Sequence, residues 1–170
     1  MTDCILQNTF LNPDEYPLKD AASEKKYNFS LNQARAKARL NNNKLLQGKT
    51  IYCVETIHGG FDAFKSIIET NGGQCALFRG RPGMPLGSRH TAGEIGQANG
   101  ATQQEEVYLI SGTDKSHVRL WPRFRTMARD SKKVPRIVRA DWLLDIAMSQ
   151  EWRWKDSLEL KEEDVPVTDD

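Results

Sequence analysis

After Gly48 the sequence alternates between short segments with the composition of β-strands and longer segments with the spacing of helices. Residues 50–54 are rich in β-branched and aromatic side chains, and apolar residues then recur at helical spacing from Phe61 until Asn71-Gly72-Gly73 ends the helix. Further strands are expected at 74–78, 107–111 and 136–138, and a last helix at 141–150. Strands separated by helices favour a small parallel sheet with helices on both faces. The sequence therefore predicts an α/β fold built on a four-stranded parallel sheet.

The length and composition of the chain limit what it can contain. With 170 residues, 38% of them hydrophobic, it can bury one ordinary core and part of a second unit. No apolar run approaches the roughly 20 residues of a membrane span, and no signal peptide pattern opens the sequence. We therefore expect a soluble, intracellular protein. Cys4, Cys53 and Cys75 lack the spacing of a zinc site or a disulfide scaffold, so buried, reduced thiols are expected.

Charge is distributed unevenly along the chain, although the net charge is only +1. Residues 114–139 contain nine Lys or Arg against two Asp, whereas residues 156–170 contain seven acidic residues against Lys161. The net charge gives the whole chain no electrostatic reason to bind nucleic acid. The pattern predicts a basic helix face and an acidic tail at 161–170, which are either solvated surface or a docking face.

The segments before and within the predicted sheet differ from ordinary connections. Residues 19–45 begin as a polar linker and become a helix at Ser30, because Ser30 and Gln33 have the spacing of a capping box. Leu31, Ala34 and Ala38 share one face of this amphipathic helix. Residues 79–106 are rich in Gly, Pro, Gln and Ser without periodicity, which predicts a mobile insertion.

The N-terminal residues repeat the pattern of the C-terminal ones. When residues 1–18 are laid on residues 143–160, Asp3 meets Asp145, Phe10 meets Trp152, Asp14 meets Asp156 and Leu18 meets Leu160. This agreement predicts that residues 1–18 are the C-terminal remnant of an upstream repeat, while chance agreement over so few positions is the alternative.

Three features over residues 46–160 resemble the BRCT domain family. They are the sequence Gly48-Lys49-Thr50-Ile51-Tyr52, the helix that closes on Gly72-Gly73, and the sequence Arg139-Ala140-Asp141-Trp142-Leu143-Leu144. The paired glycines would permit a left-handed turn, and the Trp142 indole would fill the core against the sheet, so Gly72, Gly73 and Trp142 are expected to be structural. Residues 10–16 and 24–31 resemble the linker in the tandem BRCT pair of the mediator of DNA damage checkpoint protein and its fungal DNA-damage scaffold relatives.

The resemblance implies a function in the nucleus, in the DNA-damage response. Tandem BRCT pairs bind phosphoserine or phosphothreonine peptides, including phosphorylated histone tails, across the groove between the repeats. In that family the first repeat holds the phosphate through a Ser or Thr followed by Gly, and a Lys on its second helix. Here Val54-Glu55 stands at the position of the first pair and Arg125 near that of the Lys. A carboxylate at Glu55 would repel a phosphate, so this repeat is not expected to hold phosphate by itself.

In such pairs the second repeat supplies the other wall of the groove. The residues at the matching positions are Thr56, Ile57, His58, Gly59, Gly60, Arg139 and Ala140. Arg139 could bind a peptide carboxylate or main-chain carbonyl, or it could be solvated, and His58 could be a plain surface residue.

Two other classes of function are alternatives to this prediction. Phosphate-independent scaffolding would use the basic helix face, which consists of Arg119, Arg123, Arg125 and Arg129, to bind a DNA-repair protein or, less readily, DNA. An enzyme is not expected, because the sequence has no nucleotide-binding loop, no metal-spaced His or Cys set and no nucleophile motif. His58, His90 and His117 stand in unrelated contexts. No catalytic residue, metal site or cofactor is therefore predicted.

Overall fold

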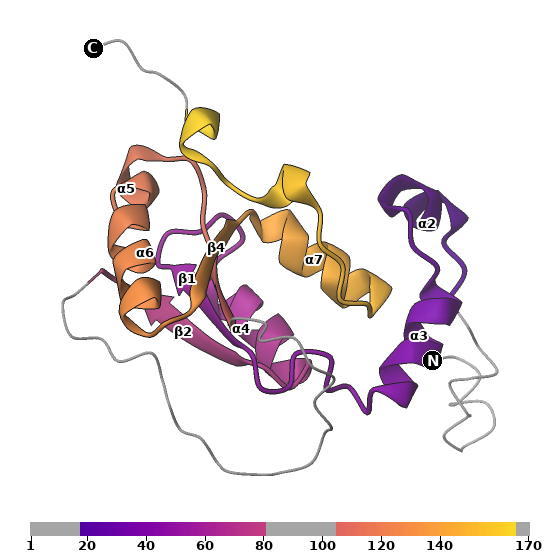
Figure 1. Ribbon diagram of the computed structural model, residues 1–170. Helices are drawn as coiled ribbons and strands as arrows, with labels where there is room; N and C mark the ends of the chain where they lie inside the picture. The colour runs from indigo at the N-terminus through magenta and orange to yellow at the C-terminus, as the bar shows by residue number, and fades with distance from the viewer. Residues whose placement is uncertain (1–17, 81–104, 166–170) are drawn as a thin grey trace.

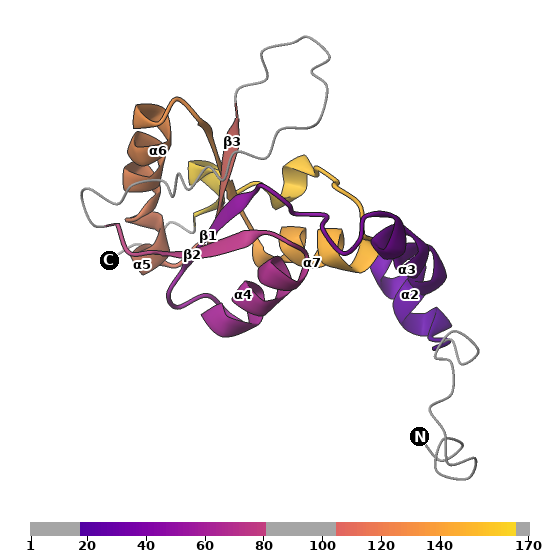
Figure 2. The same cartoon turned by 90° about the horizontal axis from the view of Figure 1, so that it is seen from below.

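A four-stranded parallel sheet forms the centre of the molecule. The computed structural model describes residues 18–80 and 105–165. The strands are β1 (Thr50–Val54), β2 (Gln74–Phe78), β3 (Glu106–Ile110) and β4 (Val134–Val138), in the order β2-β1-β3-β4 (Figure 2). The predicted fold class is confirmed. β3 begins one residue and β4 two residues earlier than predicted, because Glu106 pairs with Val134 and Val107 with Pro135 in the ladder.

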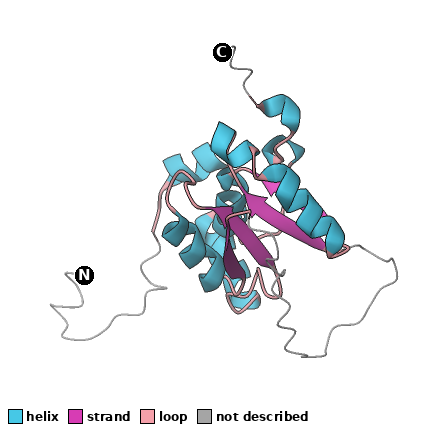
Figure 3. Ribbon diagram, turned by 90° about the vertical axis from the view of Figure 1, so that its left-hand side faces the viewer, coloured by secondary structure: helices cyan, strands magenta, loops and turns pink. Residues whose placement is uncertain are grey.

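Helices cover both faces of this sheet (Figures 1 and 3). The helices α5 (Lys115–Val118) and α6 (Trp121–Asp130) lie on one face, and α4 (Phe61–Thr70) and α7 (Ala140–Ser149) lie on the other. Side chains alternate between the faces along each strand. Tyr52 makes edge contacts with Phe78 and with Phe124 of α6, at 6.1 and 5.9 Å between ring centroids.

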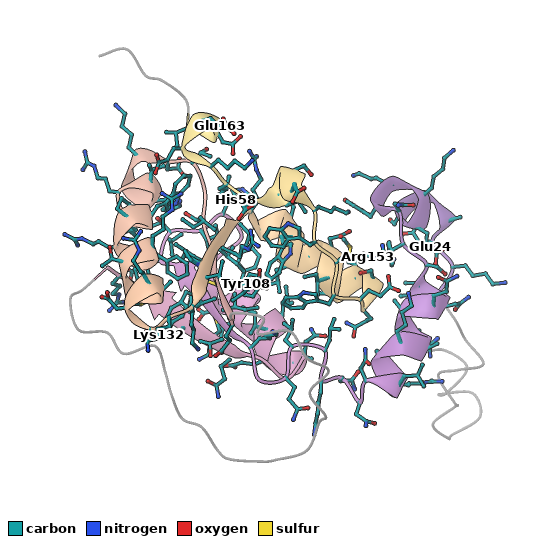
Figure 4. All side chains as sticks on the ribbon, viewed as in Figure 1. Glu24, His58, Tyr108, Lys132, Arg153 and Glu163 are labelled. Carbon is teal, nitrogen blue, oxygen red and sulfur yellow. The ribbon has the colours of Figure 1, made fainter. Side chains whose placement is uncertain are left out.

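The Trp142 side chain occupies the core between α7 and the sheet. Trp142 is 1% exposed, and its ring stacks on the Tyr108 ring, with 4.8 Å between the ring centroids and 15° between the ring planes. Trp152 stands edge-on to Trp142 and to Tyr108, at 5.4 Å from each. Figure 4 shows Tyr108 at the centre of the molecule. Among the described residues, the Trp142 indole N–H has no hydrogen-bond partner.

The two glycines after α4, Gly72 and Gly73, have different structural roles. Gly72 has φ +82°, the left-handed region that its lack of a side chain permits. Gly73 does not have a positive φ, so the expectation of a left-handed turn is right for Gly72 only. A Cβ at Gly73 would lie 2.9 Å from Ile68 Cγ2 and 3.0 Å from Leu46 Cβ. Gly73 is therefore needed for close packing.

The linker contains two helices, α2 (Ala21–Tyr27) and α3 (Leu31–Leu40), of which only α3 was predicted. The Asp20 carboxylate caps α2 by accepting from the Ser23 N–H at 3.0 Å. Ser30 precedes α3 as predicted, but its side chain makes no capping bond, so the predicted capping box is wrong. The Glu24 carboxylate reaches over from α2 and accepts from the Leu31 N–H at 2.7 Å.

The linker helices lie beside α7, away from the sheet, as Figures 1 and 2 both show. Lys37 of α3 forms an ion pair with Glu151 at 2.5 Å, and Arg153 donates to the same carboxylate at 2.6 Å. In Figure 4 Arg153 points from the end of α7 towards α3. These charge-assisted bonds join the linker to the end of α7 and hold the pKa of Glu151 below its usual value.

The C-terminal segment covers part of the outer edge of β4. The Arg139 N–H donates to the Leu158 carbonyl at 2.9 Å, and the Leu160 N–H donates to the Ile137 carbonyl at 2.7 Å. Two short 3-10 helices, η2 (Asp156–Leu158) and η3 (Glu162–Asp164), flank the buried Leu160. The described part of the predicted acidic tail is thus partly folded onto the domain.

Other predictions fall largely outside the described residues. These are the upstream remnant at 1–18, apart from Leu18, and the insertion at 79–106, apart from its ends. Within the described ranges, no helix has the length and apolar content to cross a membrane.

Candidate functional site

The carboxyl ends of the four parallel strands form one edge of the sheet, and the direction of winding reverses there. The chain passes from β1 outward to β2 and then returns to β3 on the other side of β1. Ligands of open α/β sheets bind outside the carboxyl ends of the strands at such a reversal. The loops after β1 and β3, residues 55–60 and 111–114, meet at this edge.

A hydrogen bond between Thr56 and His117 joins these two parts of the edge. Thr56 Oγ1 lies 2.7 Å from His117 Nε2, and the Gly112 N–H donates to His117 Nδ1 at 3.3 Å. Because Nδ1 accepts from Gly112, Nε2 carries the proton and donates to the Thr56 hydroxyl. Asp114 lies 3.4 Å from Nδ1, and His117 itself is buried. The imidazole therefore fixes the start of the 55–60 loop.

The remaining residues of the 55–60 loop are divided between core and surface. Ile57 is buried in the core, so it offers little surface to a peptide. His58, Gly59 and Gly60 are exposed, and both glycines have positive φ, +96° and +84°. Gly60 also forms the N-cap of α4. The open part of the loop is therefore 58–60, together with the exposed Thr56.

Glu55 and the residues after β2 complete this side of the edge. The Glu55 carboxylate pairs with Arg79 at 2.8 Å. Arg123 of α6 donates to the Gly80 carbonyl at 2.9 Å. These two cationic groups already have acceptors, and the Glu55 carboxylate adds a negative charge that would repel a phosphate at this edge. The geometry disfavours a phosphate pocket in this repeat.

Arg139 and Ala140 lie at the same edge, after β4. The Arg139 main-chain N–H is bound to Leu158, and its carbonyl accepts from the Trp142 N–H at 3.1 Å. Arg139 is exposed and stands at the point where α7 begins. β3 separates this residue from the 55–60 loop in the sheet.

The predicted basic helix face is partly occupied. Arg125 pairs with Glu162 of the C-terminal segment at 2.5 Å, and Arg123 is bound to Gly80, while Arg119 and Arg129 are exposed. A hollow of about 470 Å³ lies beside the C-terminal half of α6. It is lined by Arg125, Arg129, Lys132, Lys133, Val134 and Pro135. Figure 4 shows Lys132 at the end of α6.

A separate polar network lies at the opposite end of β3. Arg136 donates to Glu106 at 2.9 Å and to Glu159 at 3.1 Å, and the Tyr108 hydroxyl donates to Glu106. Burial opposes ionisation of Glu106, but the bonds from Tyr108 and Arg136 keep its pKa below the usual 4.5. Burial and the bond to Glu106 raise the pKa of Tyr108. Glu106 opens β3 and lies away from the candidate edge, whereas Glu159 pairs with Val138 and joins the network to the C-terminal segment.

No group of three or more His, Cys, Asp or Glu side chains suited to a metal ion occurs in residues 18–80 and 105–165.

The role of His117 could not be predicted from the sequence. A lone histidine in a four-residue helix has no periodic or motif signal. The only hint was the sequence Gly112-Thr113-Asp114 directly after a strand, which marks a turn where polar side chains approach the carboxyl end of the sheet.

Comparisons with known proteins identify the fold. The sequence matches no protein-family model and no curated protein. Its structure is similar to the crystal structure of the BRCT5-BRCT6 domains of S. pombe Brc1, with a TM-score of 0.61 and 20% identity, over 97% of this chain and 70% of that one. Two structures of Rtt107p, one of them a complex with a phosphorylated histone, match with TM-scores of 0.47 and 0.44, both at 15% identity. The match to the complex covers 94% of this chain and 62% of the Rtt107p chain, and the match to the other structure covers 93% and 61%.

This chain spans less than two thirds of the Rtt107p chains. The similarity to Brc1 is the one with a TM-score above 0.5 among these three, and it agrees with the strand order, the helices on both faces and the buried Trp142. The chain therefore has the BRCT fold, and its structure is similar to that of a tandem BRCT pair.

Proposed function

We propose that this chain is the second half of a tandem BRCT phosphopeptide reader, acting as a non-enzymatic adaptor in the nuclear DNA-damage response. Its partners would be proteins phosphorylated on serine or threonine, such as phosphorylated histone tails. The division proposed is a remnant of the upstream repeat at 1–18, a helical linker at 19–45, the complete repeat at 46–160 and an acidic tail at 161–170.

The observation that carries this proposal is the extent of the similarity. The match to the BRCT5-BRCT6 pair covers 97% of the chain, which is more than one repeat. It therefore includes the linker helices, which the Lys37–Glu151 ion pair joins to α7. The ligand class comes from the resemblance of the linker sequence to those of tandem readers.

The carboxyl edge of this repeat supports a secondary role in binding. Glu55 stands where a phosphate donor would be needed, Thr56 is engaged by His117, and Arg123 is engaged by Gly80. An upstream repeat would hold the phosphate, and the exposed residues 58–60 and Arg139, with the partly buried Ala140, would contact the peptide beyond it.

Calorimetry tests this division of labour. A longer chain that includes the upstream repeat should bind a phosphorylated acidic peptide, and phosphatase treatment of the peptide should abolish the binding. The 170-residue chain should bind both forms of the peptide feebly. Tight, phosphate-dependent binding by the 170-residue chain that Arg125→Ala abolishes would overturn the proposal.

Arg139 is the residue of this edge best suited to recognise peptide groups. Its guanidinium can grip a carboxylate with two parallel hydrogen bonds. Such a contact contributes about 1.5–3 kcal/mol, so Arg139→Ala in the longer chain should weaken binding roughly ten- to a hundredfold.

Two variants and two salt concentrations give this measurement its controls. Arg139→Lys should recover part of the lost affinity, because a lysine ammonium keeps the positive charge but cannot form the two parallel hydrogen bonds. Arg129→Ala removes an exposed arginine from the basic helix face and should leave binding unchanged. If Arg139→Ala binds like the wild type at both salt concentrations, Arg139 has no part in the site.

The hollow beside α6 favours one alternative function, phosphate-independent scaffolding through the basic helix face. Arg129 and Lys132 are exposed there, whereas Arg125 and Lys133 are paired with Glu162 and Glu105. DNA bound by several phosphate contacts should dissociate steeply as salt rises. Loss of partner binding on Arg129→Glu, without any dependence on phosphorylation, would favour this alternative.

A further inference from the structure

Two cysteines face each other between neighbouring strands of the sheet. Cys53 Sγ lies 3.8 Å from Cys75 Sγ, and both thiols are free. Cys53 belongs to β1 and Cys75 to β2, and their side chains lie on the face that α4 covers. We propose that Cys53 and Cys75 form a reversible oxidation site, which a hydroperoxide converts into an intramolecular disulfide. This inference does not depend on the proposed phosphopeptide function.

The two thiols differ in their access to solvent. Cys53 is fully buried, whereas Cys75 is partly exposed. β2 is an edge strand, since it lies at the end of the strand order, and Cys75 is its second residue. We therefore expect an oxidant to reach Cys75 before Cys53. The expectation of buried thiols from the sequence holds for Cys53 but not for Cys75, and Cys4 lies outside the described residues.

The pKa values of the two thiols are also shifted in opposite directions. The hydrogen bond between the two thiols lowers the pKa of Cys75 against the opposing effects of burial and Glu69, and Lys65 lowers it further. The same contact and burial raise the pKa of Cys53. Cys75 is thus the better nucleophile, and Cys53 is the thiol that holds the proton.

These differences give each cysteine a step in the reaction. The Cys75 thiolate attacks the outer peroxide oxygen, the O–O bond breaks, and Cys75 becomes a sulfenic acid while the hydroperoxide is reduced to hydroxide or alkoxide. The Cys53 sulfur then attacks the Cys75 sulfur as its S–H proton is lost. The new S–S bond releases water. A thiol reductant reverses the oxidation by thiol–disulfide exchange.

The sheet register makes such a bridge strained. Cys53 pairs with Leu77 and Cys75 pairs with Ile51, so the bridge would cross diagonally between the strands. Strained disulfides are the more easily reduced ones. Cys53 is followed after one residue by the 55–60 loop, so strain in β1 would reach the candidate edge.

Peptide mapping of the 170-residue chain tests the proposal. The folded protein is treated with hydrogen peroxide, free thiols are blocked with a maleimide, and the chain is digested with trypsin. Cleavage after Lys49, Lys65 and Arg79 places the two cysteines in separate peptides, 50–65 and 66–79. We expect these peptides to be joined, with the loss of two hydrogen atoms, and to separate again after thiol reduction.

Three variants distinguish the possible outcomes. Cys4→Ser should leave the bridge unchanged, which excludes pairing through the third cysteine. Cys53→Ser in the Cys4→Ser background should divert Cys75 to the sulfinic acid, because that variant has no second thiol to resolve the sulfenic acid. Cys75→Ser should leave Cys53 unmodified in the folded chain. The proposal is overturned if Cys75 of the wild type is oxidised beyond the sulfenic acid without a bridge, or if the bridged peptides contain Cys4.

Hydrogen exchange gives a readout of the structural effect. Amides of the 55–60 loop should exchange faster in the oxidised wild type than in the reduced wild type, and the oxidised Cys4→Ser variant should behave in the same way. An unchanged loop in a fully bridged chain would contradict the predicted strain.

Discussion

Replacing Trp142 by alanine should remove much of the stability of this domain. The side chain is almost completely buried, stacks on Tyr108 and meets Trp152 edge-on. Trp→Ala substitutions in cores cost about 3–5 kcal/mol through lost burial and the cavity left behind. The indole N–H has no partner, and its removal relieves part of this cost, so a value of about 3–4 kcal/mol is expected. Domains of this size are stable by about 5–15 kcal/mol.

Urea unfolding followed by circular dichroism measures this loss without relying on tryptophan fluorescence. With a slope of about 2 kcal/mol per M, the midpoint should fall by roughly 1.5–2 M. Trp152→Ala is the matched control, because Trp152 contacts the same Tyr108 but is 38% exposed, and it should cost about 1–2 kcal/mol. A loss below about 1 kcal/mol for Trp142→Ala would refute the packing described for α7.

Three further substitutions test other parts of the fold. Gly73→Ala should cost roughly 1–3 kcal/mol in urea unfolding, because the new methyl group would meet Ile68 at 2.9 Å. Thr56→Val leaves the buried His117 Nε2–H without an acceptor and should cost about 1–3 kcal/mol by the same assay. Glu106 has a lower pKa in the folded state than in the unfolded state. Its contribution to the free energy of unfolding is therefore complete above pH 4.5 and is lost as the pH falls through the folded-state pKa. Thermal unfolding across that range should show a weaker pH dependence for Glu106→Gln than for the wild type, and equal dependence would show that this network does not couple to folding.

The predictable part of the fold is the part with local sequence signals. The strands β1 and β2 and the helix α4 were located correctly because their apolar periodicity and the Asn71-Gly72-Gly73 stop agree with their packing. Helix α2 was missed because its sequence, Ala21–Tyr27, has no buried residue and therefore no apolar stripe. It is stabilised by its Asp20 cap and joined to α3 by Glu24.

The candidate site was predictable in position but not in contacts. A parallel sheet places the loops after β1 and β4 at one edge, so the location of Thr56 and Arg139 follows from topology. Contacts such as Thr56 with His117 or Arg125 with Glu162 join residues that are far apart in the sequence. The starts of β3 and β4 depend in the same way on the pairing of Glu106 with Val134.

Nuclear magnetic resonance mapping of the longer chain tests directly whether the carboxyl edge of this repeat contacts a phosphorylated peptide. The chain would be isotopically labelled, and its amide shifts would be followed during titration with phosphorylated and unphosphorylated peptide. Within this repeat, we expect phosphate-dependent shifts to concentrate at residues 56–60 and at Arg139 and Ala140. Shifts confined to Arg119, Arg125 and Arg129 that disappear with salt would contradict it and would identify the basic helix face as the binding surface.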